Sequence, residues 1–223
     1  MEIQIMKNIL GENDDIAEEN RRFFAEKKIF VLNLMGSPGS GKTSLLEKTL
    51  DKLTGELKIA VIEGDLFTGK DALRIERHGV PVIQINTAGG CHLDAQMIKA
   101  TAADLPTDNL DVIIVENVGN LVCPAEFNLG ENAKAVVLSV TEGEDKPMKY
   151  PLMFKESAVA VLNKIDLLPY VSFDRAAAEH DIAVLHPGIK IIGASCTADD
   201  DSGVAKWCQW LRAKAQEAKN GRI

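Results

Sequence analysis

About seven short apolar runs recur along the chain, and charged, helix-like segments separate them. Most of the runs lack the alternation of a half-exposed strand, which is typical of parallel strands buried on both faces. We predict strands at 29–35, 58–63, 80–85, 111–116, 134–140, 158–162 and 190–193. Alternating strands and helices predict an α/β fold with a mostly parallel sheet of about seven strands and helices on both faces.

The segments between the strands predict helices. We expect them from about Ser44 to near Gly55, from about Leu93 to Ala103, and at about 147–155, 172–181 and 202–218. The last of these should bury Val204, Trp207, Cys208 and Leu211.

The first 28 residues are charged and predict a helical extension that docks on the rest of the chain. Gly11 is expected to interrupt the helix. Asp15 and Glu18 predict a capping box for a helix that runs to about Lys28. Its apolar face is predicted to contain Ile16, Phe23 and Phe24.

A glycine-rich segment joins the first predicted strand to the first helix, and Lys-Thr ends it. This order predicts a phosphate-binding P-loop, so we expect residues 1–223 to form a single P-loop domain with its N-terminal extension. Glycine N–H groups face phosphate oxygens, and the positive end of the helix adds to their attraction. The predicted nucleotide-binding residues are Gly36, Ser37, Pro38, Gly39, Ser40, Gly41, Lys42, Thr43 and Ser44.

The segment Asn163-Lys164-Ile165-Asp166 follows the strand at 158–162 and predicts guanine as the base. The Asp166 carboxylate can accept two hydrogen bonds from guanine, and adenine lacks that pair of donors. Asn163 is expected to bridge the base edge and the P-loop, with the Lys164 stem against the ring. Ser195 and Cys196 follow the last strand and are predicted to help bind the base. The predicted ligand is GTP or GDP.

The residues expected to support hydrolysis depart from the usual GTPase motif. The common Asp-x-x-Gly is Glu116-Asn117-Val118-Gly119 here, and Asn120 stands where a glutamine would orient water. Asp65 is predicted to bind Mg²⁺ beside Thr43, and Glu116 to lie in the outer shell or orient water. The predicted catalytic residues of this magnesium-dependent GTPase are Lys42, Asp65 and Glu116. Slow turnover is expected from the lone chain.

Three soft ligands lie in two loops of the same predicted sheet edge. Cys91 and His92 are adjacent in a glycine-rich loop, and Cys123 lies in the long loop at 117–132. Two thiolates and an imidazole suit Ni²⁺, Zn²⁺ or copper. On spacing alone, unrelated cysteines remain the alternative.

Several motifs together resemble one protein family. They are GSPGSGKTSLLE, VIEGD, GGCHLDA, VIIVENVGNLVCPAEFNLGE, SVTEGEDKPMKYPLMF and LNKIDLLPY. Over residues 29–211 the chain resembles the hydrogenase nickel-insertion accessory GTPases, the HypB family. The resemblance implies GTP hydrolysis and a nickel or zinc site at Cys91, His92 and Cys123. It also implies a nucleotide-dependent homodimer that works with hydrogenase maturation proteins and the hydrogenase large subunit.

The same resemblance leaves alternatives and one departure. A urease-type nickel GTPase is the nearest alternative, although its metal motif is usually Cys-Pro-His. A metal store or scaffold with structural nucleotide is another. A small-molecule kinase would not need the guanine motif. Residues 1–28 contain neither cysteine nor histidine, so no nickel site is expected there.

The composition of the chain argues against several other classes of protein. The 46% apolar content supports a substantial core, and a net charge of −8 argues against general nucleic-acid binding. No apolar run approaches the length of a membrane span, and the N-terminus lacks the pattern of a signal peptide. The four cysteines lack the spacing of a disulfide framework, so we expect a reduced, cytoplasmic protein.

Two hypotheses concern regulation. Cys123 lies shortly after Gly119, in the loop expected to sense the γ-phosphate, so nucleotide state should change metal affinity. Leu167, Leu168, Tyr170 and Val171 are either part of a dimer surface or buried under the next helix.

Overall fold

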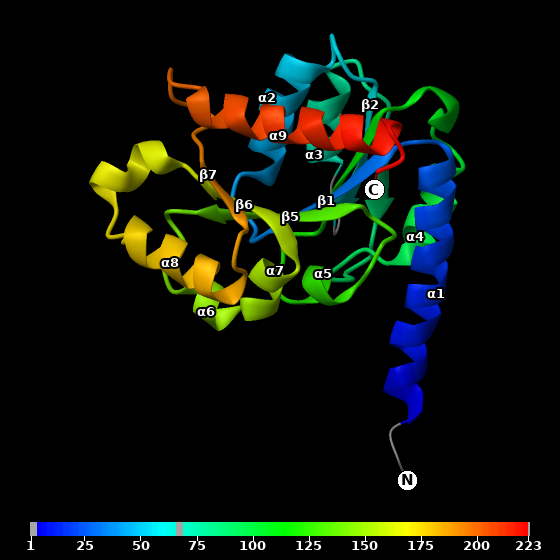
Figure 1. The fold of residues 1–223 in the computed structure, drawn as a ribbon, viewed down its shortest axis with the longest axis horizontal. Coiled ribbons are helices and arrows are strands. Elements are labelled where there is room, and N and C mark those ends of the chain that lie inside the picture. The colour runs from blue at the N-terminus through cyan, green and yellow to red at the C-terminus, as the bar shows by residue number, and fades with distance from the viewer. Residues whose placement is uncertain (1–3, 66–68, 223) are drawn as a thin grey trace.

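The computed structural model describes residues 4–65 and 69–222, with side chains from residue 11 onward. Within these ranges, seven parallel strands form one sheet in the order β3-β2-β4-β1-β5-β6-β7 (Figure 1). The strands are β1 (Phe30–Gly36), β2 (Ile59–Asp65), β3 (Val82–Asn86), β4 (Val112–Glu116), β5 (Ala133–Ser139), β6 (Ser157–Asn163) and β7 (Lys190–Gly193). The predicted α/β fold with its parallel sheet is confirmed.

Helices cover both faces of the sheet, as predicted (Figure 1). On one face lie α2 (Lys42–Leu53), α3 (Lys70–Glu76) and α9 (Ser202–Lys219). On the other lie α1 (Gln4–Glu26), α4 (Ala95–Ala102), α5 (Cys123–Glu126), α6 (Lys146–Lys149), α7 (Pro151–Lys155) and α8 (Arg175–Leu185). Two 3₁₀ helices span Thr107–Asn109 and Ile165–Tyr170. No helix of the described residues is long and apolar enough to cross a membrane.

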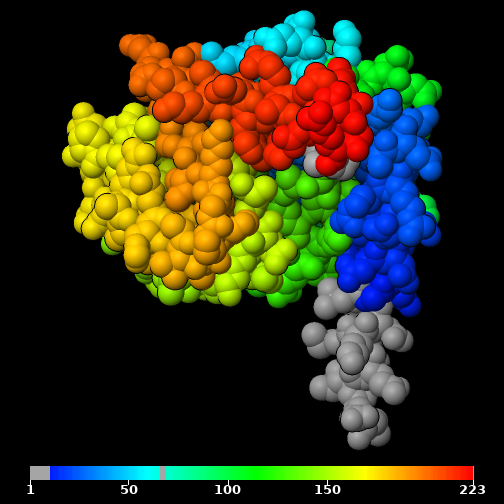
Figure 2. Space-filling view, viewed as in Figure 1, coloured from blue at the N-terminus to red at the C-terminus, as the bar shows by residue number. Residues whose placement is uncertain are grey.

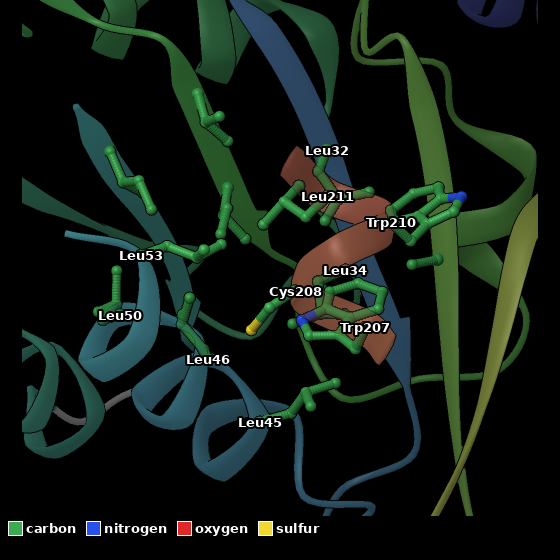
Figure 3. Packing of buried hydrophobic residues seen from close by; sticks show 14 of the residues in the cluster. Leu32, Leu34, Leu45, Leu46, Leu50, Leu53, Trp207, Cys208, Trp210 and Leu211 are labelled. Atoms are coloured by element: carbon green, nitrogen blue, oxygen red, sulfur yellow. The ribbon is translucent and has the colours of Figure 1, made fainter. Parts of the chain in front are cut away.

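The helix that follows the P-loop is fixed by a large apolar core. Leucines of α2 pack between β1 and α9, and each buried leucine contributes about 1.5–3 kcal/mol (Figure 3). Trp207 of α9 lies against Trp210, and its Nε1 donates to Thr49 Oγ1 of α2 at 2.8 Å. The burial of Val204, Trp207, Cys208 and Leu211 is confirmed. This core holds α2 rigidly below the phosphate loop.

The prediction for the N-terminal segment was wrong in two respects. The helix α1 runs without interruption through Gly11, and Asp15 and Glu18 lie in its interior, so they form no capping box. Glycine inside a helix costs only about 1 kcal/mol relative to alanine, and packing of one face offsets that. Figure 2 shows the part of α1 from residue 11 onward in blue, along one side of the molecule.

The buried face of α1 also differs from the prediction. Phe23 is 37% exposed, whereas the buried residues among the described side chains of this helix, from residue 11 onward, are Asn13, Ala17, Asn20 and Phe24. The two asparagines bond to backbone atoms of α4 and of the segment at 128–129. The helix is therefore docked largely by amide hydrogen bonds, which apolar periodicity does not reveal.

Prolines lie at the start of short helices in two other segments. The helix predicted at 147–155 is two short helices, because Pro151 begins α7 after Tyr150 leaves the helical conformation. The long loop at 117–132 contains α5, in which Pro124 occupies the first turn. That helix begins at Cys123 and so fixes the direction of its thiol.

Candidate functional site

A cleft of about 450 Å³ opens at the carboxyl ends of β1, β2 and β4. Ligands bind at this edge in parallel sheets. Its lining residues are Pro38, Gly39, Gly41, Lys42, Thr43, Ser44, Glu63, Gly64, Asp65, Asp71, Arg74, Glu116, Asn117, Val118, Gly119 and Lys164. Lys42, Thr43 and Asp65 therefore line one cavity with part of the predicted phosphate loop, whereas Gly36, Ser37 and Ser40 are not among its lining residues.

The phosphate loop has the backbone that its glycines permit. Gly39 and Gly41 have φ angles of 76° and 95°, in the left-handed region that favours glycine. A Cβ on Gly41 would lie 2.3 Å from Asn163 Nδ2. Lys42 Nζ donates to the carbonyl oxygens of Gly36 and Ser37, each at 3.2 Å. The ammonium is thus held at the mouth of the loop, within reach of a bound phosphate.

Two buried carboxyls form the floor of the cleft. Glu63 and Glu116 are register partners on β2 and β4 and are 2% and 4% exposed. Burial, and then the charge of Glu116, raise the pKa of Glu63. Burial also raises the pKa of Glu116, against the Lys42 charge and the hydroxyl of Thr43, which donates to Glu116 Oε1 at 2.8 Å.

The floor has the chemistry of a site for a hard cation. One oxygen on each of Glu63 and Glu116 has no hydrogen-bond partner among the described residues. Asp65 ends β2 and lines the same cleft as Thr43. Carboxylate and hydroxyl oxygens near a phosphate site fit Mg²⁺. Sequence reasoning missed Glu63; the signal was an acidic residue inside an otherwise apolar strand.

The predicted base-binding residues converge on the phosphate loop. Asn163 ends β6, and its Nδ2 donates to Ser40 O at 2.9 Å. Lys164 has a left-handed φ of 60°, which costs about 1–2 kcal/mol, and its Nζ donates to Gly39 O at 2.7 Å. Such strain is typical of functional positions. The guanine motif and the P-loop are therefore one connected structure.

The loop after β7 closes the same region. Asp166 Oδ2 accepts from Thr197 Oγ1 at 3.5 Å, and Oδ1 is without a partner among the described residues. The thiol of Cys196 lies 3.6 Å from Asn163 Oδ1, and burial raises its pKa to about 11. Ser195 Oγ accepts from the backbone N–H groups of Thr197 and Ala198. The hydroxyl of Ser195 thus shapes the turn that carries Cys196.

The two predicted thiol ligands lie together at the surface. The Sγ atoms of Cys91 and Cys123 are 3.1 Å apart, and Cys91 Sγ is 3.5 Å from His92 Nδ1. One ligand atom from each of the three residues lies within 4.8 Å of the others. The His92 ring stacks on Phe127 with centroids 3.8 Å apart. The fold therefore brings together three residues that the sequence separates into two loops.

The electrostatics of this cluster suit a soft divalent cation. The hydrogen bond with Cys91, and then burial, raise the pKa of Cys123, and repulsion between two adjacent thiolates adds to the shift. Burial lowers the pKa of His92, which favours the neutral imidazole that binds metals. A bound cation would remove the repulsion between the thiolates. The residues present thus fit nickel or zinc.

A buried amide network supports the cluster from below. Asn117 Oδ1 accepts from the N–H groups of Leu93 and Val118, and its Nδ2 donates to Asn33 Oδ1 at 3.1 Å. Asn33 Nδ2 donates to Glu131 at 3.2 Å. Asp94 caps α4 by accepting from Met97 N and so fixes where the loop with Cys91 ends. The network joins the two loops that carry the thiols.

Comparison with known proteins assigns the family. The model of the CobW/HypB/UreG nucleotide-binding domain matches residues 30–193. The hydrogenase maturation factor HypB of Escherichia coli strain K12 is 50% identical over 214 residues, which cover 96% of this chain and 72% of that protein. The chain belongs to the HypB branch of the CobW/HypB/UreG family. The resemblance identified in the sequence is confirmed.

Solved HypB structures share the fold along most of the chain. HypB from Helicobacter pylori in complex with nickel superposes with a TM-score of 0.87 at 38% identity, covering 92% of this chain and 96% of that one. HypB from Archaeoglobus fulgidus gives a TM-score of 0.86 at 37% identity, with coverages of 92% and 100%. The fold described above is thus that of a HypB-type chain.

Proposed function

We propose that this chain is a GTP-hydrolysing nickel chaperone that assists nickel insertion into [NiFe]-hydrogenase in the cytoplasm. One observation carries the proposal. Three soft ligands, Cys91, His92 and Cys123, meet at the surface beside a phosphate loop and a guanine motif. The names of its relatives, hydrogenase maturation factor HypB, and a relative solved in complex with nickel support the same role.

The nucleotide half would bind GTP through residues already in place. Lys42 would donate to the β- and γ-phosphates, and Asp166 would accept from the guanine edge. Mg²⁺ would be held by Thr43 and Asp65, and when bound it would neutralise charge on the phosphates. Glu116, hydrogen-bonded to Thr43, would position Thr43 and accept from water. Slow hydrolysis is expected, since Asn120 stands where a glutamine would orient water.

The metal half would carry nickel as cargo. Cys91 and Cys123 would bind as thiolates, and His92 as neutral imidazole. Cys91 is exposed, so the cluster leaves one side open to an incoming ligand. A partner such as another maturation protein or the hydrogenase large subunit could then take the metal by ligand exchange. Zinc would occupy the same donors, because borderline ligands accept both ions.

A second copy is also proposed as a partner, bound in a nucleotide-dependent manner. Tyr170 is 83% exposed beside the half-buried Leu167 and Leu168. Leu167→Ala combined with Val171→Ala is expected to weaken the dimer in analytical ultracentrifugation with a GTP analogue. A dimer that persists in this variant would remove this surface from the proposal.

The proposed function is tested by separating its two halves. Lys42→Ala should abolish GTP hydrolysis while the chain still binds nickel through Cys91, His92 and Cys123. Cys123→Ala should leave guanine-nucleotide binding intact and weaken nickel binding by about 100-fold or more, since a ligand contributes at least as much as the outer-shell groups around it. For both variants, GTP hydrolysis is measured by phosphate release, and nickel affinity by competition with a coloured chelator.

Two results would overturn this assignment. One is a wild-type chain that binds no nickel more tightly than Cys123→Ala does. The other is GTP turnover that Lys42→Ala leaves unchanged. A chain that binds nickel and guanine nucleotide but never hydrolyses GTP would instead be a metal store with structural nucleotide.

A further inference from the structure

We propose that Asn120 is the positioning residue that transmits the state of the phosphate loop to the two thiols. The inference rests on the proposed function and adds a named carrier to it. Asn120 contacts the phosphate loop through its backbone and the thiol-bearing segments through its side chain.

The backbone of Asn120 is bound to the phosphate loop. Asn120 N donates to Gly36 O at 3.1 Å, and the two residues form an isolated antiparallel bridge. Its neighbour Gly119 packs against Pro38 so closely that a Cβ would lie 2.9 Å from Pro38 N. Displacement of the segment at 36–38 must therefore displace the segment at 119–120.

The side chain of Asn120 is bound to both thiol-bearing segments. Its Nδ2 donates to Cys91 O at 3.3 Å, and its Oδ1 accepts from Val122 N at 2.8 Å, directly before Cys123. One amide thus sets the position of Cys91 relative to Cys123.

The carbonyl of Gly36 provides the switch. It accepts from Asn120 N and from Lys42 Nζ at 3.2 Å. GTP would offer the Lys42 ammonium a β- and a γ-phosphate, whereas GDP would offer the β-phosphate alone. GTP would therefore draw the ammonium farther from this carbonyl and leave the carbonyl more fully to Asn120. The hydrogen bond to Asn120 would then strengthen, since a shared acceptor bonds each donor less well. Because Asn120 sets the position of Cys91 relative to Cys123, the bound nucleotide would change the separation of the two thiols and their affinity for nickel.

The experiment compares the nickel affinity of the full chain with Mg²⁺-GDP and with a Mg²⁺-bound non-hydrolysable GTP analogue. The readout is the ratio of the two dissociation constants, which cancels any uniform loss of affinity. Asn120→Ala removes both side-chain contacts. Asn120→Asp keeps the acceptor for Val122 N and removes the donor to Cys91. Asn109→Ala is the matched control, because this exposed asparagine precedes the amino end of β4, whereas the cleft lies at the carboxyl end.

For the wild type and Asn109→Ala, the ratio should differ from one by about fivefold or more, and nickel should change analogue affinity by the same factor. In both Asn120 variants the ratio should fall to about one. The nickel–thiolate charge-transfer band should shift between the two nucleotide states in the wild type and in Asn109→Ala, and should not shift in the two Asn120 variants. A merely structural role would weaken nickel binding equally in both nucleotide states.

The outcomes separate this inference from the proposed function. A wild-type ratio retained in the Asn120 variants would overturn the inference and leave the nickel-chaperone role standing. The inference would also be overturned if the wild type bound nickel tightly with a ratio of dissociation constants of one, because nickel affinity would then not depend on the nucleotide. Loss of nickel binding in the wild type itself would instead overturn the proposed function.

Discussion

The phosphate loop and the thiol cluster lie at the same edge of the sheet but are built differently. The phosphate loop takes its shape from consecutive residues, with Gly39 and Gly41 in left-handed conformations. The thiol cluster joins two loops that meet only in the fold, above the buried amide network of Asn117 and Asn33. Substitutions within the phosphate loop should therefore disrupt nucleotide binding. The thiol cluster should instead be disrupted by substitutions at buried positions that are distant from it in sequence.

The largest expected effect is on the support of the thiol cluster. Asn117→Ala would leave the buried N–H groups of Leu93 and Val118 without their acceptor. Each unsatisfied buried group costs about 1–3 kcal/mol, so the free energy of unfolding should fall by about 3 kcal/mol in urea titrations. Nickel affinity should fall by about tenfold, as for other outer-shell groups.

The control for this prediction is Asn109→Ala, whose side chain is exposed. It should change the free energy of unfolding by about 0.5 kcal/mol or less. A stable Asn117→Ala variant with unchanged nickel affinity would show that the thiol loops hold their own shape.

The next effect is local to the phosphate loop. Gly41→Ala places a Cβ at a φ of 95° and 2.3 Å from Asn163 Nδ2. Guanine-nucleotide affinity should fall by about 100-fold, or about 2.7 kcal/mol, because the loop and the base motif shift together. Nickel binding without nucleotide should stay within about twofold. Isothermal titration calorimetry measures both.

Gly55→Ala is the matched substitution, since a Cβ there meets nothing within 4 Å. It should leave nucleotide affinity unchanged. If Gly41→Ala also abolished nickel binding without nucleotide, the structure of the thiol cluster would depend on that of the phosphate loop.

The smallest effect concerns the carboxyl pair at the floor of the cleft. Burial, and then the Glu116 charge, raise the pKa of Glu63, so the folded state holds a proton that the unfolded chain releases. The unfolded chain binds fewer protons above the ordinary glutamate pKa of about 4.3, so the free energy of unfolding declines as pH rises toward the raised pKa. Glu63→Gln removes this decline.

Urea titrations without Mg²⁺ and nucleotide provide the measurement. From roughly pH 6 to 8, the variant should gain about 1 kcal/mol per pH unit relative to the wild type. Glu12→Gln, at an exposed position of α1, should follow the wild-type pH dependence. Parallel curves for Glu63→Gln and the wild type would show that Glu63 ionises normally in the fold.

Sequence patterns predicted the sheet well because each buried parallel strand is a continuous apolar run. All seven predicted strands are present, with ends within about two residues. The same patterns failed for α1, where Asn13 and Asn20 supply much of the docking through amide hydrogen bonds. They also missed Glu63, because its pairing with Glu116 follows from the β2–β4 register.

The sequence by itself determined the phosphate loop, the guanine motif and the strand pattern, since each depends on residues adjacent along the chain. Only the tertiary structure decided that Cys91 and Cys123 meet, that Glu63 faces Glu116, and that Asn120 contacts both the phosphate loop and Cys91. Those pairs are fixed by the order of parallel strands in the sheet. Strand order depends on the packing of the whole core, and no local spacing encodes it.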